Sequence, residues 1–151
     1  MGDSVFQKGH LIVADEFTAA TAVTSRATLL ASTNLGACPD HPVGLILDGR
    51  DNTYFQTSWA VPANGWVMVD LGATRSITKV EIRLVYYFNE GVVEASQDGL
   101  TSWVRMGDLF DKQEFIYTAP AGTEFRYIRL RNAGGQGPIL HIRRINVTLG
   151  T

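Results

Sequence analysis

The densest group of metal-binding residue types lies in one short polar segment, Asp48-Gly49-Arg50-Asp51-Asn52-Thr53. Carboxylate, carbonyl and hydroxyl oxygens are the ligands that Ca²⁺ takes, at ~2.3–2.6 Å. The same residue types also build a tight turn, because Asp and Asn side chains bond nearby backbone and glycine accepts a positive φ. The segment lacks the closing Glu of an EF-hand loop. The residues alone therefore leave two interpretations open, a calcium loop and a structural turn.

Aromatic residues beside polar ones form a second group of chemical interest, Tyr86-Tyr87-Phe88-Asn89. Tyr86 completes the inward face of a predicted strand, and Tyr87 and Phe88 enter the turn that follows. An aromatic ring outside the core can cover the apolar face of a sugar, while Arg83 and Asn89 bond its hydroxyl groups. The alternative is that Tyr87 and Phe88 pack against neighbouring loops.

Trp59 stands in another polar loop, after Gln56-Thr57-Ser58, and the same two interpretations apply to it. No catalytic constellation accompanies these aromatic residues: the sequence has no Gly-x-Ser-x-Gly elbow, no phosphate loop and no His-Glu-x-x-His motif. Paired carboxylates could hydrolyse a glycosidic bond. The glutamates, however, lie where ordinary surface charges are expected, at Glu81, Glu90, Glu94 and Glu114. We therefore predict that the chain is not an enzyme.

Composition excludes several further classes of function. The chain has 151 residues, with 13 basic and 15 acidic side chains and a formal net charge of −2. This balance argues against a nucleic-acid binder, which usually carries a basic face. No run approaches the ~18 apolar residues of a membrane-spanning helix, so no membrane span is predicted. Cys38 is the only cysteine, which excludes an intrachain disulfide and a cysteine-rich zinc site.

Short strands between regular turn signals must position these groups. Residues alternate between apolar and polar over Ile77–Tyr86, as expected for a strand with one buried face. Further strands are predicted at Trp66–Leu71, Val92–Ser96, Glu114–Tyr117, Phe125–Arg131 and Ile142–Leu149. Ala20–Leu30 has apolar residues at helical spacing, but its Thr and Val content favours an extended or irregular segment. The pattern predicts an all-β sandwich or barrel.

Several stretches, in this order, resemble the discoidin domain, also called the coagulation factor V/VIII type C domain, and are most similar to carbohydrate-binding module family 32. They are Leu47–Phe55, Trp66–Gly72, Ile77–Ile82, Ala95–Gly99 with Trp103, and Arg126–Leu130. The resemblance implies an eight-stranded jelly-roll β-sandwich, like that of galactose-binding domains, which binds ligand with loops at one end. It places residues 11–151 in one domain, after leader or cloning residues 1–10.

The resemblance also implies a structural calcium ion, held by Asp48, the Asp51 carbonyl and Thr53. The last ligand in the family is usually a Glu in the final strand, where this chain has Arg144. A guanidinium group repels a cation and is able to bond Asp48 directly, replacing the ion. Two alternatives therefore remain open for this loop: it binds Ca²⁺, or Arg144 takes the place of the ion.

For the ligand, the resemblance implies a sugar held by residues after the Asp-Gly loop and around the middle turn. The predicted carbohydrate contacts are Gln56, Trp59, Arg83, Tyr87, Phe88 and Asn89. The leading hypothesis is a non-catalytic carbohydrate-binding module that meets a glycan or glycoconjugate. The alternative is a cell-adhesion or assembly module with a protein or lipid partner. In both cases we expect part of a larger protein, located outside the cell or at its surface.

Overall fold

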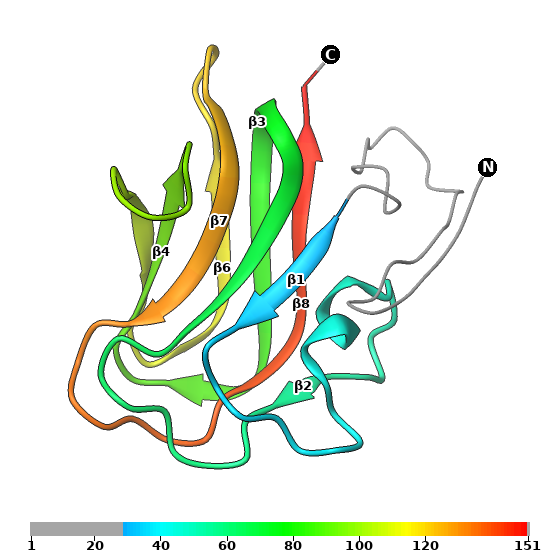
Figure 1. Cartoon of the computed structure of the whole chain (residues 1–151), viewed down its shortest axis with the longest axis vertical. Coiled ribbons are helices and arrows are strands. Elements are labelled where there is room, and N and C mark those ends of the chain that lie inside the picture. The colour runs from blue at the N-terminus through cyan, green and yellow to red at the C-terminus, as the bar shows by residue number, and fades with distance from the viewer. Residues whose placement is uncertain (1–28, 151) are drawn as a thin grey trace.

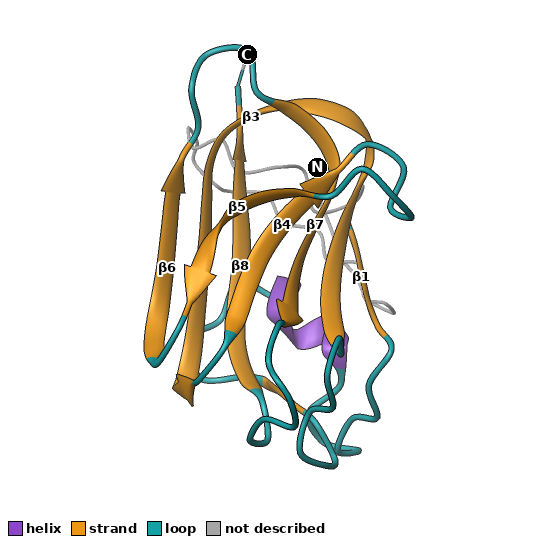
Figure 2. Ribbon diagram, turned by 90° about the vertical axis from the view of Figure 1, so that its left-hand side faces the viewer, coloured by secondary structure: helices purple, strands orange, loops and turns teal. Residues whose placement is uncertain are grey.

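The computed structural model describes residues 29–150, which form eight antiparallel strands and one short 3₁₀ helix (Figures 1 and 2). The strands are β1 (Leu30–Thr33), β2 (Phe55–Gln56), β3 (Trp66–Phe88), β4 (Gly91–Ser96), β5 (Val104–Leu109), β6 (Lys112–Thr118), β7 (Glu124–Asn132) and β8 (His141–Leu149), and the helix is η2 (Val43–Leu47). This confirms the predicted all-β, eight-stranded sandwich. The leader assigned to residues 1–10 lies outside the described residues, and so does Ala20–Leu30 except for its last two residues, of which Leu30 begins β1.

Strand β3 runs through both layers of the sandwich. Residues 66–76 pair with β1 and β7, and residues 77–88 pair with β6 and β8. We call the layer β1-β3-β7-β4-β5 the first sheet and the layer β2-β8-β3-β6 the second sheet. The two strands expected at Trp66–Leu71 and Ile77–Tyr86 are therefore limbs of one strand. The chain bends between them, where Gly72 has a φ of 85° and the pairing with β7 shifts.

The core lies between the sheets and is built by the alternation along the strands. Its centre is formed by Val67, Val69, Leu71, Val80, Ile82, Leu84, Ile128, Leu130, Ile142, Ile145 and Val147, all of which are buried. Burying one such side chain contributes about 1.5–3 kcal/mol by transfer out of water. This packing gives a firm base for the loops at both ends of the sandwich.

The end of β3 departs from the predicted alternation. Tyr86 was expected inward and is 63% exposed, whereas Phe88 was expected in a surface turn and is only 2% exposed. The reason is irregular pairing: between Arg83 and Phe88, β3 has more residues than its partner β6. Phe88 keeps the two-residue repeat of the buried Leu84, whereas the irregular pairing lets Tyr86 leave that face and turn outward. The ring of Phe88 then lies under Gly137, where an added Cβ would come within 2.9 Å of Phe88 Cζ.

One further expectation is corrected on the outer face of the first sheet. Glu94 is not an ordinary surface charge: it is 8% exposed and accepts hydrogen bonds from Arg129 and Arg131. Burial beside two guanidinium groups was invisible in the sequence, because β4 and β7 become neighbours only in the fold.

In residues 29–150 no helix is long and apolar enough to cross a membrane.

Candidate binding site at the loop end

Three long loops gather at one end of the sandwich, the lower end in Figure 1. They are residues 34–42 between β1 and η2, residues 57–65 between β2 and β3, and residues 133–140 between β7 and β8. We call these three loops, with the short β3–β4 turn beside them, the loop end. The β4–β5 connection lies at the opposite end of the sandwich (Figure 1).

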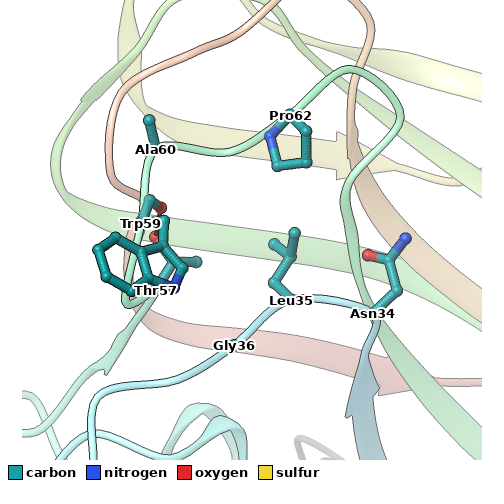
Figure 3. Close-up of a pocket in the computed structure, with 7 residues that line it drawn as sticks. All are labelled: Asn34, Leu35, Gly36, Thr57, Trp59, Ala60 and Pro62. Atoms are coloured by element: carbon teal, nitrogen blue, oxygen red, sulfur yellow. Dashed lines mark hydrogen bonds between the residues drawn. The ribbon is translucent and has the colours of Figure 1, made fainter.

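A cavity of about 170 Å³ opens between the first two of these loops (Figure 3). It is lined by Asn34, Leu35, Gly36, Thr57, Trp59, Ala60 and Pro62. The indole of Trp59 forms one wall and is 77% exposed, an unusual position for so large an apolar group. The cavity is smaller than the ~300–1,000 Å³ typical of sites for drug-sized ligands. It suits a single ring that stacks against the indole.

Asn34 supplies a polar group on the other side of this cavity. Its Oδ1 accepts a hydrogen bond from the backbone N–H of Trp66, at 2.8 Å. That bond fixes the orientation of the amide. The amide thereby contributes a polar group to a lining that is otherwise mostly apolar.

Thr57 holds the turn that carries Trp59. Its hydroxyl donates to the Trp59 carbonyl at 2.8 Å and accepts from the Leu140 N–H at 3.0 Å. The backbone N–H of Thr57 also donates to the Leu140 carbonyl at 3.0 Å. Because Thr57 is buried and bonded in this way, the backbone turn that carries the indole is fixed before any ligand arrives, which lowers the entropy cost of binding.

Asn132, at the end of β7, ties the second and third loops together. Its Nδ2 donates to the carbonyls of Val61 and Pro62, both at 3.1 Å, and of Gly135 at 2.7 Å. Its Oδ1 accepts from the Gly134 N–H at 3.0 Å. A role for Asn132 was not predicted from the sequence. The available signal was an Asn directly before a glycine-rich loop, but its partners near position 61 are distant in sequence.

A row of four rings lies where the loop end meets the second sheet. We call His41, Tyr54, His141 and Tyr86 the aromatic row. His41 stacks on Tyr54 at 4.2 Å between ring centroids, Tyr54 lies 5.8 Å from His141, and Tyr86 meets His141 edge-on at 4.8 Å. Burial lowers the pKa of His141, and the nearby His41 lowers it further, against a raising backbone hydrogen bond. Gln56 pairs with His141 between β2 and β8, which places it next to the row.

The predicted sugar contacts fall into three groups. Trp59, Tyr87 and Asn89 are exposed at or near the loop end, and Gln56 is half-buried there. Phe88 was wrongly predicted as a stacking residue, because its ring is buried in the core.

Arg83 stands apart from this group. It lies in the middle of the second sheet, where its Nη2 bonds Glu114 at 2.5 Å and Glu81 at 3.4 Å. The structure therefore does not bring Arg83 to Trp59.

The Asp48–Thr53 loop lies against the start of β8. The Asp48 carboxylate accepts from the Thr53 hydroxyl at 2.6 Å and from the Arg50 N–H at 2.9 Å. The Asp51 carbonyl accepts from Arg143 Nη1 at 2.5 Å. Arg144 bonds the Asp51 carboxylate, not that of Asp48 as expected.

This donor set does not fit a calcium ion. Two guanidinium groups bond Asp51, which the resemblance assigns to the ion, and β8 carries Arg144 where a Glu would be needed. Nowhere in residues 29–150 do three His, Cys, Asp or Glu side chains form a group able to hold a metal ion.

Comparisons with known proteins agree with this architecture. The family model described as the F5/8 type C domain matches residues 22–145. No curated protein matches the chain in sequence.

Three solved structures illustrate the likeness in fold. The family 32 CBM of C. perfringens NanJ in complex with galactose has a TM-score of 0.69 at 20% identity, over 83% of this chain and 97% of that one. Chitosan-binding module 1 from the chitosanase/glucanase of Paenibacillus sp. IK-5 has a TM-score of 0.67 at 17% identity, over 80% and 94%. The Ruminococcus gnavus GH29 fucosidase in complex with fucose has a TM-score of 0.68 at 20% identity, over 82% of this chain and 26% of that one.

Proposed function

The chain belongs to the F5/8 type C domain family, and on that premise we propose that it is a non-catalytic domain that binds carbohydrate with its loop end. The observation that carries the proposal is the exposed indole of Trp59 on the wall of a cavity the size of one ring. Aromatic faces suit the apolar side of a sugar, and a few polar groups around them fix its orientation. The similar structures that hold galactose or fucose, or that bind chitosan, favour a sugar over other ligands.

We assign roles to the residues around the cavity from their positions. Trp59 stacks on one face of the sugar ring, and Asn34 borders the ring from the other side of the cavity. Gln56, Tyr87 and Asn89 extend the contact surface toward β3. Among residues 29–150 no carboxylate lines the cavity, so we assign it the binding of a sugar and not the cleavage of a glycosidic bond.

Calorimetric titration with sugars chosen from a glycan array tests this proposal. Trp59→Ala should weaken binding about 10–100-fold, as expected when a central aromatic contact is lost. Leu100→Ala is the matched control, because Leu100 is equally exposed but lies in the β4–β5 connection at the opposite end. Failure of every sugar to bind at millimolar concentration would refute the proposal, and so would equal effects of the two substitutions.

The exposed rings of Tyr86 and Tyr87 favour a second candidate function, an adhesion or assembly module that docks on a protein or lipid partner. Neighbouring exposed aromatic residues are enriched where proteins meet other surfaces. Co-sedimentation with lipid vesicles that is lost in Tyr86→Ser/Tyr87→Ser, and unchanged in Trp59→Ala, would support this function. We place either function outside the cell or at its surface, within a larger protein, because glycans and adhesion partners are presented there.

A further inference from the structure

The Asp48–Thr53 loop and the start of β8 meet on the outer side of the second sheet. We propose that Arg143 and Arg144 hold this loop in the place of a bound cation, so that the domain keeps the loop folded without calcium. The proposal concerns only this loop, and it stands or falls independently of the sugar site.

A break in the pairing of β8 allows two consecutive arginines to reach one loop. Arg144 and Ile142 pair with consecutive residues of β3, so Arg143 is an extra residue on β8. Consecutive side chains of a regular strand point to opposite faces, whereas a bulge interrupts that alternation. Ile142 and Ile145 are both buried although they are three residues apart. Arg143 and Arg144 are thus left together on the outer side.

The oxygens that would bind a cation are already bonded to these arginines or to the loop itself. Arg143 donates to the carbonyl of Asp51 at 2.5 Å, and Arg144 bonds its carboxylate. The Asp48 carboxylate is taken by the hydroxyl of Thr53 and by a backbone N–H within the loop. Ca²⁺ requires about six to eight oxygen ligands. A guanidinium group supplies its positive charge to the same oxygens without that requirement.

Arg144 also connects the loop to the sheet behind it. Its Nη2 lies 3.9 Å from Glu81 Oε2, which in turn lies 3.4 Å from Arg83 Nη2. Arg83 continues the series to Glu114 on β6 at 2.5 Å. Positive and negative groups therefore alternate from the loop across β8, β3 and β6. A divalent cation at the loop would therefore be repelled by the guanidinium groups of Arg143 and Arg144. The carboxylates of Asp48 and Asp51 already accept hydrogen bonds.

The stability of the purified chain in EDTA and in millimolar CaCl₂ tests the proposal. We expect the same Tm for the unmodified chain in both solutions, and no calcium binding by calorimetry. Arg144→Gln keeps most of the side-chain volume but removes the charge. It should lower the Tm by about 2–4 °C to the same extent in EDTA and in CaCl₂.

A double substitution tests whether the arginines stand where a cation would. Arg143→Ala/Arg144→Glu frees the Asp51 carbonyl and supplies the missing carboxylate, so CaCl₂ should now raise the Tm. The control is Arg143→Ala/Lys79→Glu, which makes the same change in charge on the second sheet but retains Arg144. Its Tm should not respond to calcium.

Three results would overturn the proposal. One is a rise in the Tm of the unmodified chain on addition of calcium, which is measurable even if the double variant does not fold. Another is an Arg144→Gln variant as stable as the parent chain. The third is a folded Arg143→Ala/Arg144→Glu variant whose Tm is the same in EDTA and in CaCl₂.

Discussion

The amide of Asn132 joins two loops of the loop end to the end of β7, and Asn132→Ala should loosen both loops. The side chain is 3% exposed, and its two polar atoms bond three carbonyls and one N–H. A typical intramolecular hydrogen bond contributes about 0.5–1.5 kcal/mol net, and a buried group left without a partner costs about 1–3 kcal/mol. Because water can enter at the loop end, we expect a total loss of about 2–4 kcal/mol.

Urea denaturation measures this loss directly. A loss of this size corresponds to a fall in Tm of roughly 5–15 °C. Gln136→Ala is the matched control, since Gln136 is an exposed amide in the same loop. Asn132→Ala should also bind sugar more weakly, because the backbone beside Trp59 is no longer fixed. A change in the free energy of unfolding below about 0.5 kcal/mol, the usual range for a surface substitution, would refute this account of the loop end.

Further predictions concern buried groups whose roles the fold reveals. Burial raises the pKa of Glu94, but bonds to Arg131 and Arg129 outweigh it and hold this pKa below 4.5. Stability from Glu94 is therefore present at neutral pH and is lost as the pH falls through the folded-state value; Glu94→Gln should cost about 1–3 kcal/mol at pH 7 and flatten acid unfolding curves. The lowered pKa of His141 means that the unfolded chain binds the proton more readily, so stability falls as the pH drops below 6.5. His141→Gln should remove that part of the pH dependence in thermal melts between neutral and mildly acidic pH, and an unchanged slope would contradict the shift. Phe88→Ala should cost about 3–5 kcal/mol of stability, whereas Tyr87→Ala should leave the Tm nearly unchanged and weaken sugar binding. The opposite pattern would restore the original prediction for Phe88.

The features that follow from local pattern were predictable from the sequence. Period-two alternation identified the second limb of β3, and also β7 and β8, because a strand with one buried face must alternate. The polar neighbours of Trp59 left open whether its ring is exposed or packs on nearby loops, and the structure shows that it is exposed. The family resemblance implied a sandwich of eight strands, which no single pattern could supply.

The features that were missed depend on contacts between segments far apart in sequence. Tyr86 and Phe88 exchange their expected places because β3 and β6 do not pair regularly beyond Arg83. Asn132 finds its partners about 70 residues away. Arg143 and Arg144 share a side of the sheet only because β8 bulges at that point. In each case the decisive fact is pairing between strands or loops, which the local residue types do not encode.

The central claim is that a sugar binds beside Trp59 at the loop end. NMR of the ¹⁵N-labelled chain during titration with a panel of monosaccharides tests it most directly, with Trp59→Phe to assign the indole signal among the three tryptophans. The account predicts that one sugar shifts the Trp59 indole resonance and the amides of residues 34–36 and 57–62, and leaves residues 97–103 unchanged. Shifts confined to residues outside the loop end, or no shift with any sugar, would contradict it.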